Sequence, residues 1–592
     1  MKIKNQFIKT DIVVFISLII FVKILGSYKF GLGDQTAQLP SIFRMLDDKF
    51  ILNDFFVNIR ENFGPRYYYN HFISFLGKFL SLELVYLFLT IIINFTIAIL
   101  TYLVSMKLFN QSKLIAFIST ALVLTVNPFV LGGGGWVVNN YLKPALLARP
   151  FAYFAIWFAI NQKPYLLLIM ACISSLFHPT LGLETGAFSL GVLFLGNIYK
   201  IKNHNKFDLF TIFNRMLPLL MVSLIFGLFA LICWVLPYDR SLSSEKFIEI
   251  MTFRAWSSLL PSYFDLKGYL GSTIFLITLF ISWITWKRKD YTDSILPNLL
   301  MSLFITVILF CSMGFIFVEI FPTRAFMTAW TFRTLYIVKW LGMIIISGSL
   351  ISYLQKENNK LVKFINSLIP FKNYSRYYTQ LVYLIIAILF YLVFKESGQI
   401  NPLYYFGSIS LVFWFFNVNK AVIKIGFPIF CSFLVLLNVV NPLIFKDLMI
   451  KNRPVIKLVS NIVDDGALGI AEYSKEFTEP DAIFLTPPGF GGFRLSAERA
   501  IVIDYKSIPF QDLGLLGWWE RMNDCYGELS KGNPKTRVKE IFEDYKNITS
   551  KRIDSIEKKY NISYVVLYTQ TKTNLPIVYS DNNFKLVKAS LN

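Results

Sequence analysis

One acidic residue stands where a membrane-surface reaction would need a base. Asp34 lies within the run GLGDQ, shortly after an apolar stretch at 10–27, so solvent, lipid headgroups and protein would meet around it. A carboxylate in that place can take a proton from an acceptor hydroxyl or hold a metal ion. Asp54 offers the same chemistry twenty positions later. The simpler alternatives are a turn at Gly33-Asp34 and a helix cap at Asp54.

Further polar residues lie at the predicted ends of apolar stretches and could contact a substrate. His178 directly follows one such stretch, and Glu184 comes six positions later. An ionisable residue at a membrane boundary is a functional hypothesis in its own right. For His178 the alternative is an anchor at a helix end, and for His71 it is a place in an interfacial aromatic belt. Gln35, next to Asp34, completes this group of candidates.

Three arginines are candidates for binding a phosphate. Arg149, Arg324 and Arg333 each lie in or beside an apolar stretch. A guanidinium can grip two phosphate oxygens at once, and an unpartnered cation near lipid is costly, so a lipid phosphate would suit it. The alternative is that each arginine reaches the headgroups or pairs with a carboxylate. The loop from Phe321 to Arg333 has no acidic residue to act as a local partner.

The elements that position these residues are predicted membrane helices. Of the 592 residues, 55% are hydrophobic and only 16% are charged, unlike an ordinary soluble domain. A helix of roughly 20 apolar residues crosses the hydrocarbon core of a bilayer. Run length predicts about thirteen spans, at 10–27, 82–106, 113–131, 145–161, 164–179, 181–199, 216–236, 269–286, 295–321, 334–354, 379–395, 402–417 and 421–445.

The distribution of basic residues predicts the orientation. The net charge of +21 would suggest nucleic-acid binding in a soluble protein, but here Lys and Arg gather in short loops between spans. That pattern marks the cytoplasmic side of a plasma membrane and gives no indication of a nucleic-acid partner. The N-terminus is then cytoplasmic, and the outer loop 28–81 and the C-terminal segment face outward. We expect the bacterial inner membrane as the location.

The chain changes character after Phe445. Residues 446–592 show short strand-like runs separated by a charged helical stretch, which predicts a soluble α/β domain outside the membrane domain 1–445. Its length is enough for a core of its own, so we expect it to fold independently.

The layout resembles the GT-C superfamily of integral-membrane glycosyltransferases. The resemblance is carried by the runs GDQTAQLPSIFRMLDD, LKPALLARPFAYFAIW, SSLFHPTLGLE and IVIDYKSIPF followed by WWERM, which are similar to a bacterial group of that superfamily. It implies a polytopic helical fold with a C-terminal soluble domain and transfer of a sugar from a polyprenyl-phosphate-linked donor to a glycan, lipid or protein acceptor. The family's acidic residue in the first outer loop carries over to Asp34, with Asp54 second.

One departure concerns the metal. The metal-dependent branch of the superfamily has further carboxylates in a second outer loop, where this chain has GGGGWVVNN with no acid. This speaks against a divalent cation, and no cofactor is assigned. Two alternatives remain open: a flippase for lipid-linked sugars or a solute transporter, and a polysaccharide polymerase or ligase. Transporters place charged sites near mid-membrane and show repeated halves, whereas here polar groups gather in outer loops and no halves repeat.

Overall fold

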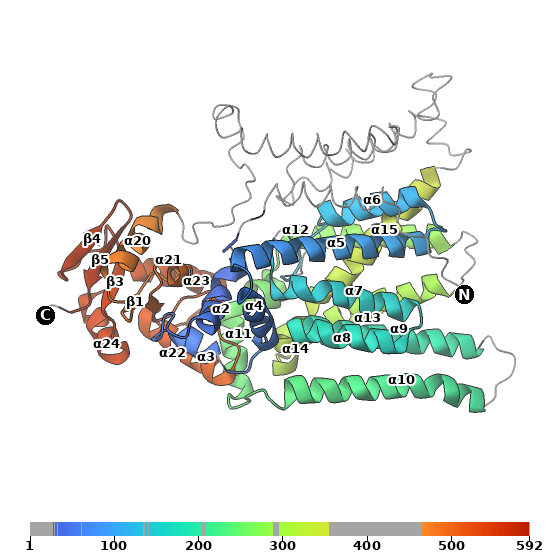
Figure 1. Cartoon of the computed structure of the whole chain (residues 1–592), viewed down its shortest axis with the longest axis horizontal. Coiled ribbons are helices and arrows are strands. Elements are labelled where there is room, and N and C mark those ends of the chain that lie inside the picture. Colours follow the sequence, from blue (N-terminus) through green and yellow to red (C-terminus); the bar gives the residue numbers. More distant parts are fainter. Residues whose placement is uncertain are drawn as a thin grey trace, which may run out of the picture.

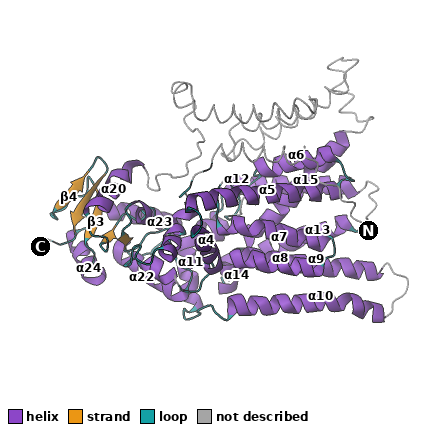
Figure 2. Cartoon of the chain, viewed as in Figure 1, coloured by secondary structure: helices purple, strands orange, loops and turns teal. Residues whose placement is uncertain are grey.

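The structure, a computed structural model, describes residues 28–354 and 465–590, apart from short gaps at 29, 32, 61, 134–136, 140, 203–208 and 288–294. The described part is mostly helical and ends in a small α/β region (Figures 1 and 2). The predicted spans at 10–27, 379–395, 402–417 and 421–445 lie outside the described residues, as does the predicted boundary between residues 445 and 446.

Six described helices are long and apolar enough to cross a membrane. They are Leu82–Leu108, Pro179–Tyr199, Phe213–Val235, Leu266–Lys287, Leu296–Ile320 and Arg324–Ser352. Three shorter apolar helices accompany them, at Ile115–Leu124, Pro144–Ile160 and Pro164–Phe177. Together they fall on the nine predicted spans between residues 82 and 354. A total of thirteen is not confirmed.

These helices lie side by side as a bundle (Figure 1). α7 packs against α5, α8 and α9, and α15 packs against α6 and α12. The bundle helices are α5 (Leu82–Leu108), α6 (Lys113–Thr125), α7 (Pro144–Ile160), α8 (Pro164–Phe177), α9 (Pro179–Lys202), α10 (Leu209–Ala230), α12 (Leu266–Lys287), α13 (Leu296–Phe315) and α15 (Leu335–Leu354).

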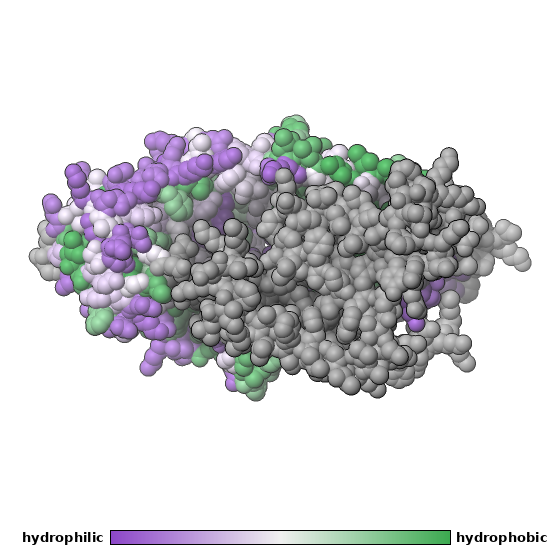
Figure 3. Space-filling view, turned by 90° about the horizontal axis from the view of Figure 1, so that it is seen from above, coloured by the Kyte–Doolittle hydropathy of each residue, from purple (hydrophilic) through white to green (hydrophobic). Residues whose placement is uncertain are grey.

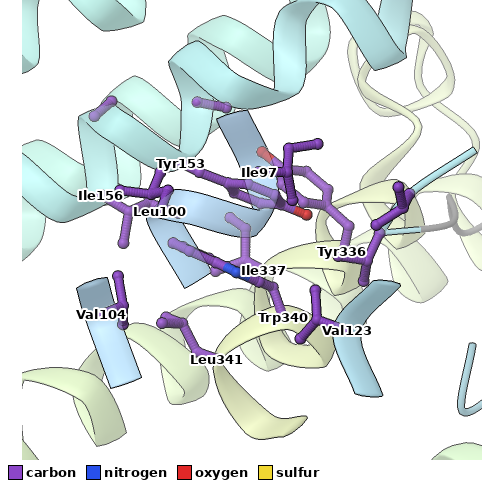
Figure 4. Packing of buried hydrophobic residues seen from close by; sticks show 14 of the residues in the cluster. Ile97, Leu100, Val104, Val123, Tyr153, Ile156, Tyr336, Ile337, Trp340 and Leu341 are labelled. Carbon is purple, nitrogen blue, oxygen red and sulfur yellow. The ribbon is translucent and has the colours of Figure 1, made fainter. Parts of the chain in front are cut away.

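Aromatic side chains hold the centre of the bundle together. The ring of Tyr153 on α7 stacks on that of Trp340 on α15, with centroids 4.0 Å apart (Figure 4). Trp340 Nε1 also donates a hydrogen bond of 2.9 Å to Thr101 Oγ1 on α5, so one indole joins three helices. The outward side of α10, in contrast, exposes large apolar side chains such as Leu220 and Leu224, as a lipid-facing surface would.

Short helices fill the space between one end of the bundle and the α/β region (Figure 1). They come from the loop 28–81 and from the connections between bundle helices. They are the 3-10 turn η1 (Gly33–Ala37), α2 (Leu39–Leu46), α3 (Phe55–Arg60), α4 (Tyr67–Gly77), α11 (Ser244–Leu259), η3 (Pro261–Tyr263), α14 (Arg324–Ala329) and the 3-10 turn η5 (Thr331–Thr334). The segments predicted to lie outside the membrane therefore gather at one end of the bundle.

The α/β region is built on a mixed sheet of five short strands in the order β2-β1-β3-β5-β4. β1 is parallel to β2 and β3, and β5 is antiparallel to β3 and β4. Figure 3 shows mostly hydrophilic surface over this region and apolar patches over the visible part of the bundle. Its elements are α20 (Leu468–Phe477), β1 (Ile483–Leu485), α21 (Phe493–Ser496), β2 (Ala500–Ile501), α22 (Asp512–Tyr526), α23 (Pro534–Lys546), α24 (Ser550–Tyr560), β3 (Tyr564–Tyr568), β4 (Ile577–Ser580) and β5 (Phe584–Lys588).

The core of the α/β region continues into the loops of the bundle. Phe253 of α11 packs its ring edge-on against Trp519 of α22, with centroids 5.7 Å apart. Met327 of α14 is fully buried in the same hydrophobic cluster. Trp518 and Trp519 of α22 therefore belong to a core that is shared between the two parts of the chain, which argues against the expectation that the C-terminal segment folds independently.

Candidate functional site

The turn that carries Asp34 is held in place by its neighbours. Gln35, fully buried, accepts a hydrogen bond from the backbone N–H of Gly31 at 2.7 Å and donates one to the carbonyl of Leu142 at 2.9 Å. Gly33 has φ +61° and lies so close to Tyr141 that a Cβ would come within 3.0 Å of its hydroxyl. Both features fix the turn against the segment that precedes α7. Gln35 is therefore placed to orient Asp34.

Four cations surround the Asp34 carboxylate. Burial raises the pKa of Asp34, but the charges of Lys143, Arg66, Lys506 and Arg333 outweigh it and leave the pKa below its ordinary value. Within the described part of the chain, the Asp34 side chain forms neither a hydrogen bond nor an ion pair. It is thus an ionised, unpaired carboxylate in a positive environment. We call these five residues the Asp34 cluster.

The four cations come from four separate elements. Arg66 immediately precedes α4, Lys143 immediately precedes α7, and Arg333 belongs to the turn η5 before α15. Lys506 comes from the α/β region, in the loop between β2 and α22. Only Arg333 was a candidate from sequence. Lys143 and Lys506 lie within the runs LKPALLARP and IVIDYKSIPF. Because these runs carry the family resemblance, they could have indicated the two lysines from the sequence.

Lys506 is tied directly to the loop that carries Asp34. Its Nζ donates a hydrogen bond to the carbonyl of Gly33, and its own carbonyl accepts one of 2.9 Å from Arg254 Nη2 of α11. Arg254 also lies over the ring of Tyr505, 4.8 Å from its centroid. The α/β region therefore contributes a charge to the site next to Asp34.

Arg149 lies deeper in the bundle and is almost completely buried. Its Nε and Nη1 have no hydrogen-bond partner among the described residues, and its guanidinium lies 5.8 Å from the ring centroid of Tyr336. Lys339 of α15 is fully buried, close enough to Arg149 for their charges to repel, and donates a hydrogen bond of 3.4 Å to Asn127 Oδ1. Lys339 was not a candidate from sequence. Its place within an apolar helix was the available signal.

His178 and Glu184 border the same region. Arg333, Arg66, Arg149 and Lys143 are near enough to act electrostatically on His178, whose Nδ1 accepts the backbone N–H of Leu181 at 3.3 Å. The charge of Arg333 likewise acts on Glu184. The Oε1 atom of Glu184 is buried and has no hydrogen-bond partner among the described residues. The charges of these cations therefore act on both side chains.

Asp54 is engaged elsewhere. Its Oδ2 accepts a hydrogen bond of 2.7 Å from Arg494 Nε, and its Oδ1 accepts the backbone N–H of Val57 at 3.0 Å. Arg494 also pairs with Asp504, and all three side chains are fully buried. The simpler interpretation, that Asp54 caps the start of α3, is therefore correct for its contact with Val57. We assign it a structural role in joining the loop 28–81 to the α/β region.

Arg324 and His71 also lie outside the Asp34 cluster. Arg324 Nη2 pairs with the buried Asp512 at 2.6 Å, and its Nη1 donates to the carbonyl of Leu242 at 2.7 Å. The acidic partner that Arg324 lacks within its own loop is therefore Asp512 of α22. His71 is exposed and its ring lies at a tilt against that of Tyr67, with centroids 4.1 Å apart.

The surroundings of Asp34 do not suit a divalent cation. In residues 28–354 and 465–590, as far as they are described, no three or more His, Cys, Asp or Glu side chains come together as metal ligands. Lys143, Arg66, Lys506 and Arg333 would also repel a metal at Asp34. We therefore derive no step through a metal ion.

A family model matches part of the C-terminal α/β region. The family model described as Domain of unknown function (DUF6798) matches residues 467–525. No curated protein matches the chain. The matched segment runs from the start of α20 to near the end of α22 and contains Arg494, Lys506 and Asp512. It therefore holds the residues that link the α/β region to the loop 28–81, to Asp34 and to Arg324.

Proposed function

We propose that this chain is a membrane glycosyltransferase that transfers a sugar from a polyprenyl-phosphate-linked donor to an acceptor. The site would lie on the extracytoplasmic face of a bacterial inner membrane, with the N-terminus in the cytoplasm and about thirteen spans in total. The resemblance to the GT-C superfamily supports this proposal. The membrane helices and the α/β region agree with it.

The observation that carries the proposal is the state of Asp34. It is an ionised carboxylate with no hydrogen bond or ion pair in the described part of the chain, and four cations act on it at the end of a bundle of apolar helices. A charged group left unpaired in a partly buried place is costly unless function requires it. A base beside a phosphate-binding region is the chemistry that sugar transfer from a lipid phosphate requires.

The reaction would proceed by displacement at the anomeric carbon. Asp34 accepts the proton of the acceptor hydroxyl as the new oxygen–carbon bond forms, and the bond from that carbon to the phosphate oxygen breaks. The polyprenyl phosphate leaves with the electron pair, and its growing negative charge is stabilised by Arg149 and Arg333, joined by Lys339. Arg324 is not assigned to the phosphate because it already forms an ion pair with Asp512.

Donor binding would also improve Asp34 as a base. In the free protein the surrounding cations hold its pKa down, which makes the carboxylate ionised but weakly basic. A bound phosphate offsets part of that positive charge and allows the pKa to rise. The base would therefore be strongest when the donor is in place.

A flippase for lipid-linked sugars is the second candidate. The complete burial of Lys339 within the span Arg324–Ser352 favours it, because charged groups inside transport proteins often mark a substrate path. Such a protein would move the lipid-linked sugar without breaking its bond to phosphate. The same labelled donor can test both candidates.

The test uses the full chain in lipid nanodiscs or vesicles with polyprenyl-phosphate sugars labelled in the sugar. With an envelope extract as the source of acceptors, the protein should move label from the lipid fraction to another product. Asp34→Asn should reduce this transfer about 10²-fold or more, the usual scale for loss of a general base. Asp48→Asn, an exposed position in the same loop, is the matched control and should keep full activity. Movement of labelled lipid across vesicles without any transfer would instead favour the flippase.

A further inference from the structure

The cations around Asp34 carry more positive charge than the Asp34 carboxylate and one donor phosphate would neutralise. Arg66, Lys143, Arg333 and Lys506 all act on Asp34, and Arg254 lies beside Lys506. Glu184 acts on Arg333, and Asp504, which pairs with Arg494, acts on Lys506. Among the described residues, Asp34 is the acid whose charge acts on Lys143. The outer part of the site therefore keeps several cations that need an anion.

The donor phosphate has its own cations deeper in the bundle. Arg149 follows Lys143 by six positions, and Lys339 follows Arg333 by six. At the helical rise of 1.5 Å per residue, the inner pair, Arg149 and Lys339, lies about 9 Å further along the bundle than the outer pair. The outer pair is Lys143 and Arg333. The unpartnered nitrogens of Arg149 are all donors, as is the free amide nitrogen of Asn127 beside Lys339. With Arg333 also assigned to this phosphate, Lys143, Arg66 and Lys506 remain available to a second anion.

The outer cations face the side from which a water-soluble acceptor would arrive. Lys506 is exposed and belongs to the α/β region, whose surface is largely hydrophilic (Figure 3). Arg254 holds the backbone of Lys506 and has a buried Nε with no hydrogen-bond partner among the described residues. The site is thus positive at its water-facing side, beside the residue that would act as base.

From this arrangement we infer that the acceptor carries an oxyanion, a phosphate or carboxylate group, which Lys506 and Arg66 bind while its hydroxyl faces Asp34. This inference rests on the proposed function and names the acceptor class. A charge-assisted contact would fix the position of the acceptor hydroxyl, and guanidinium and ammonium groups both bind such oxyanions. A neutral glycan would leave these cations without a partner in the complex.

The experiment measures binding of three small sugars to the full chain in nanodiscs of neutral phosphatidylcholine, so that no lipid headgroup with net negative charge competes. The probes are glucose 6-phosphate, glucuronate and glucose, and binding is followed by titration calorimetry. Both anionic sugars should bind at least about tenfold more tightly than glucose, and the difference should shrink at high salt. Preference for only one of them identifies the oxyanion. Equal affinity for all three would overturn the inference.

Variants assign the effect to the outer cations. Lys506→Gln keeps a donor for the Gly33 carbonyl but removes the charge, and should reduce the preference for anionic sugars about tenfold. Lys506→Arg should retain it, and Lys475→Met, which removes an exposed charge at the surface of the α/β region, should not change it. An unchanged preference in Lys506→Gln would refute the inference.

Binding of polyprenyl phosphate separates this inference from the proposed function. It should be unaffected by Lys506→Gln and weakened by Lys339→Met. If wild-type protein fails to bind polyprenyl phosphate, the proposed function fails. If the lipid binds but anionic sugars show no advantage, the acceptor inference alone fails.

Discussion

Arg494 gives the sharpest test of how the α/β region is joined to the rest of the chain. Its side chain is fully buried and bridges two fully buried carboxylates, Asp54 at 2.7 Å and Asp504. It also lies over the ring of Phe56, 5.2 Å from the centroid. Arg494→Met would keep much of the apolar stem but remove the charge, leaving two buried like charges facing each other.

The structure allows the size of this effect to be estimated. Breaking a buried pair by removing one partner typically costs about 3–5 kcal/mol. The backbone N–H groups of Ile501 and Ser507 would still donate to Asp54 and Asp504, so the lower half of that range is expected. For a cooperative unit of 150–250 residues, about 3 kcal/mol lowers the melting temperature by roughly 6–12 °C.

The assay is thermal unfolding of the purified protein in detergent at neutral pH. Without Arg494, two buried carboxylates lose their shared partner, so the Arg494→Met variant should melt below the wild type. Lys475→Met breaks an exposed pair with Glu498 and should cost at most about 1 kcal/mol. An Arg494→Met variant that melts with the wild type at neutral pH would refute the reasoning.

Four further outcomes follow from the site and its supports. Because nearby cations lower the pKa of Asp34, the apparent pKa on the acid side of the kcat/KM profile should lie below the ordinary aspartate range. The corresponding apparent pKa in the kcat profile should be higher, because donor phosphate is then bound. Burial lowers the pKa of Lys143 to about 8, so the affinity for anionic sugars should fall as its charge is lost above that pH, and Lys143→Arg should move the fall to higher pH. Arg324→Ala should lower the melting temperature by unpairing the buried Asp512 without changing donor affinity in the folded protein; a selective loss of affinity would return Arg324 to the phosphate site. Residues 465–590 expressed alone should be catalytically inert and prone to aggregate, because their core is completed by α11; a monomeric, cooperatively folded fragment would contradict this.

Much of the bundle could be predicted from the sequence because hydrophobic run length is a local property. A stretch of roughly 20 apolar residues becomes a helix whatever surrounds it in a membrane, since lipid offers the backbone no other partner. The nine spans predicted between residues 82 and 354 accordingly coincide with apolar helices. The α/β character of the C-terminal segment was readable for a similar reason, from short strand-like runs and a charged helical stretch. Asp34 became a candidate for the same kind of reason, because it follows the first apolar run.

The tertiary structure decided which charges meet. Asp54 was the second candidate base from sequence and Arg324 was a candidate phosphate ligand beside Arg149, but Asp54 pairs with a residue 440 positions away and Arg324 with one 188 positions away. Lys506, 473 positions from Gly33, enters the site the same way. Ion pairing depends on distance in space, and sequence spacing encodes that only within a helix or a turn. The sequence by itself therefore determined the helices and the kinds of charge available, and the packing of the α/β region against the bundle determined which of those charges are paired and which surround Asp34.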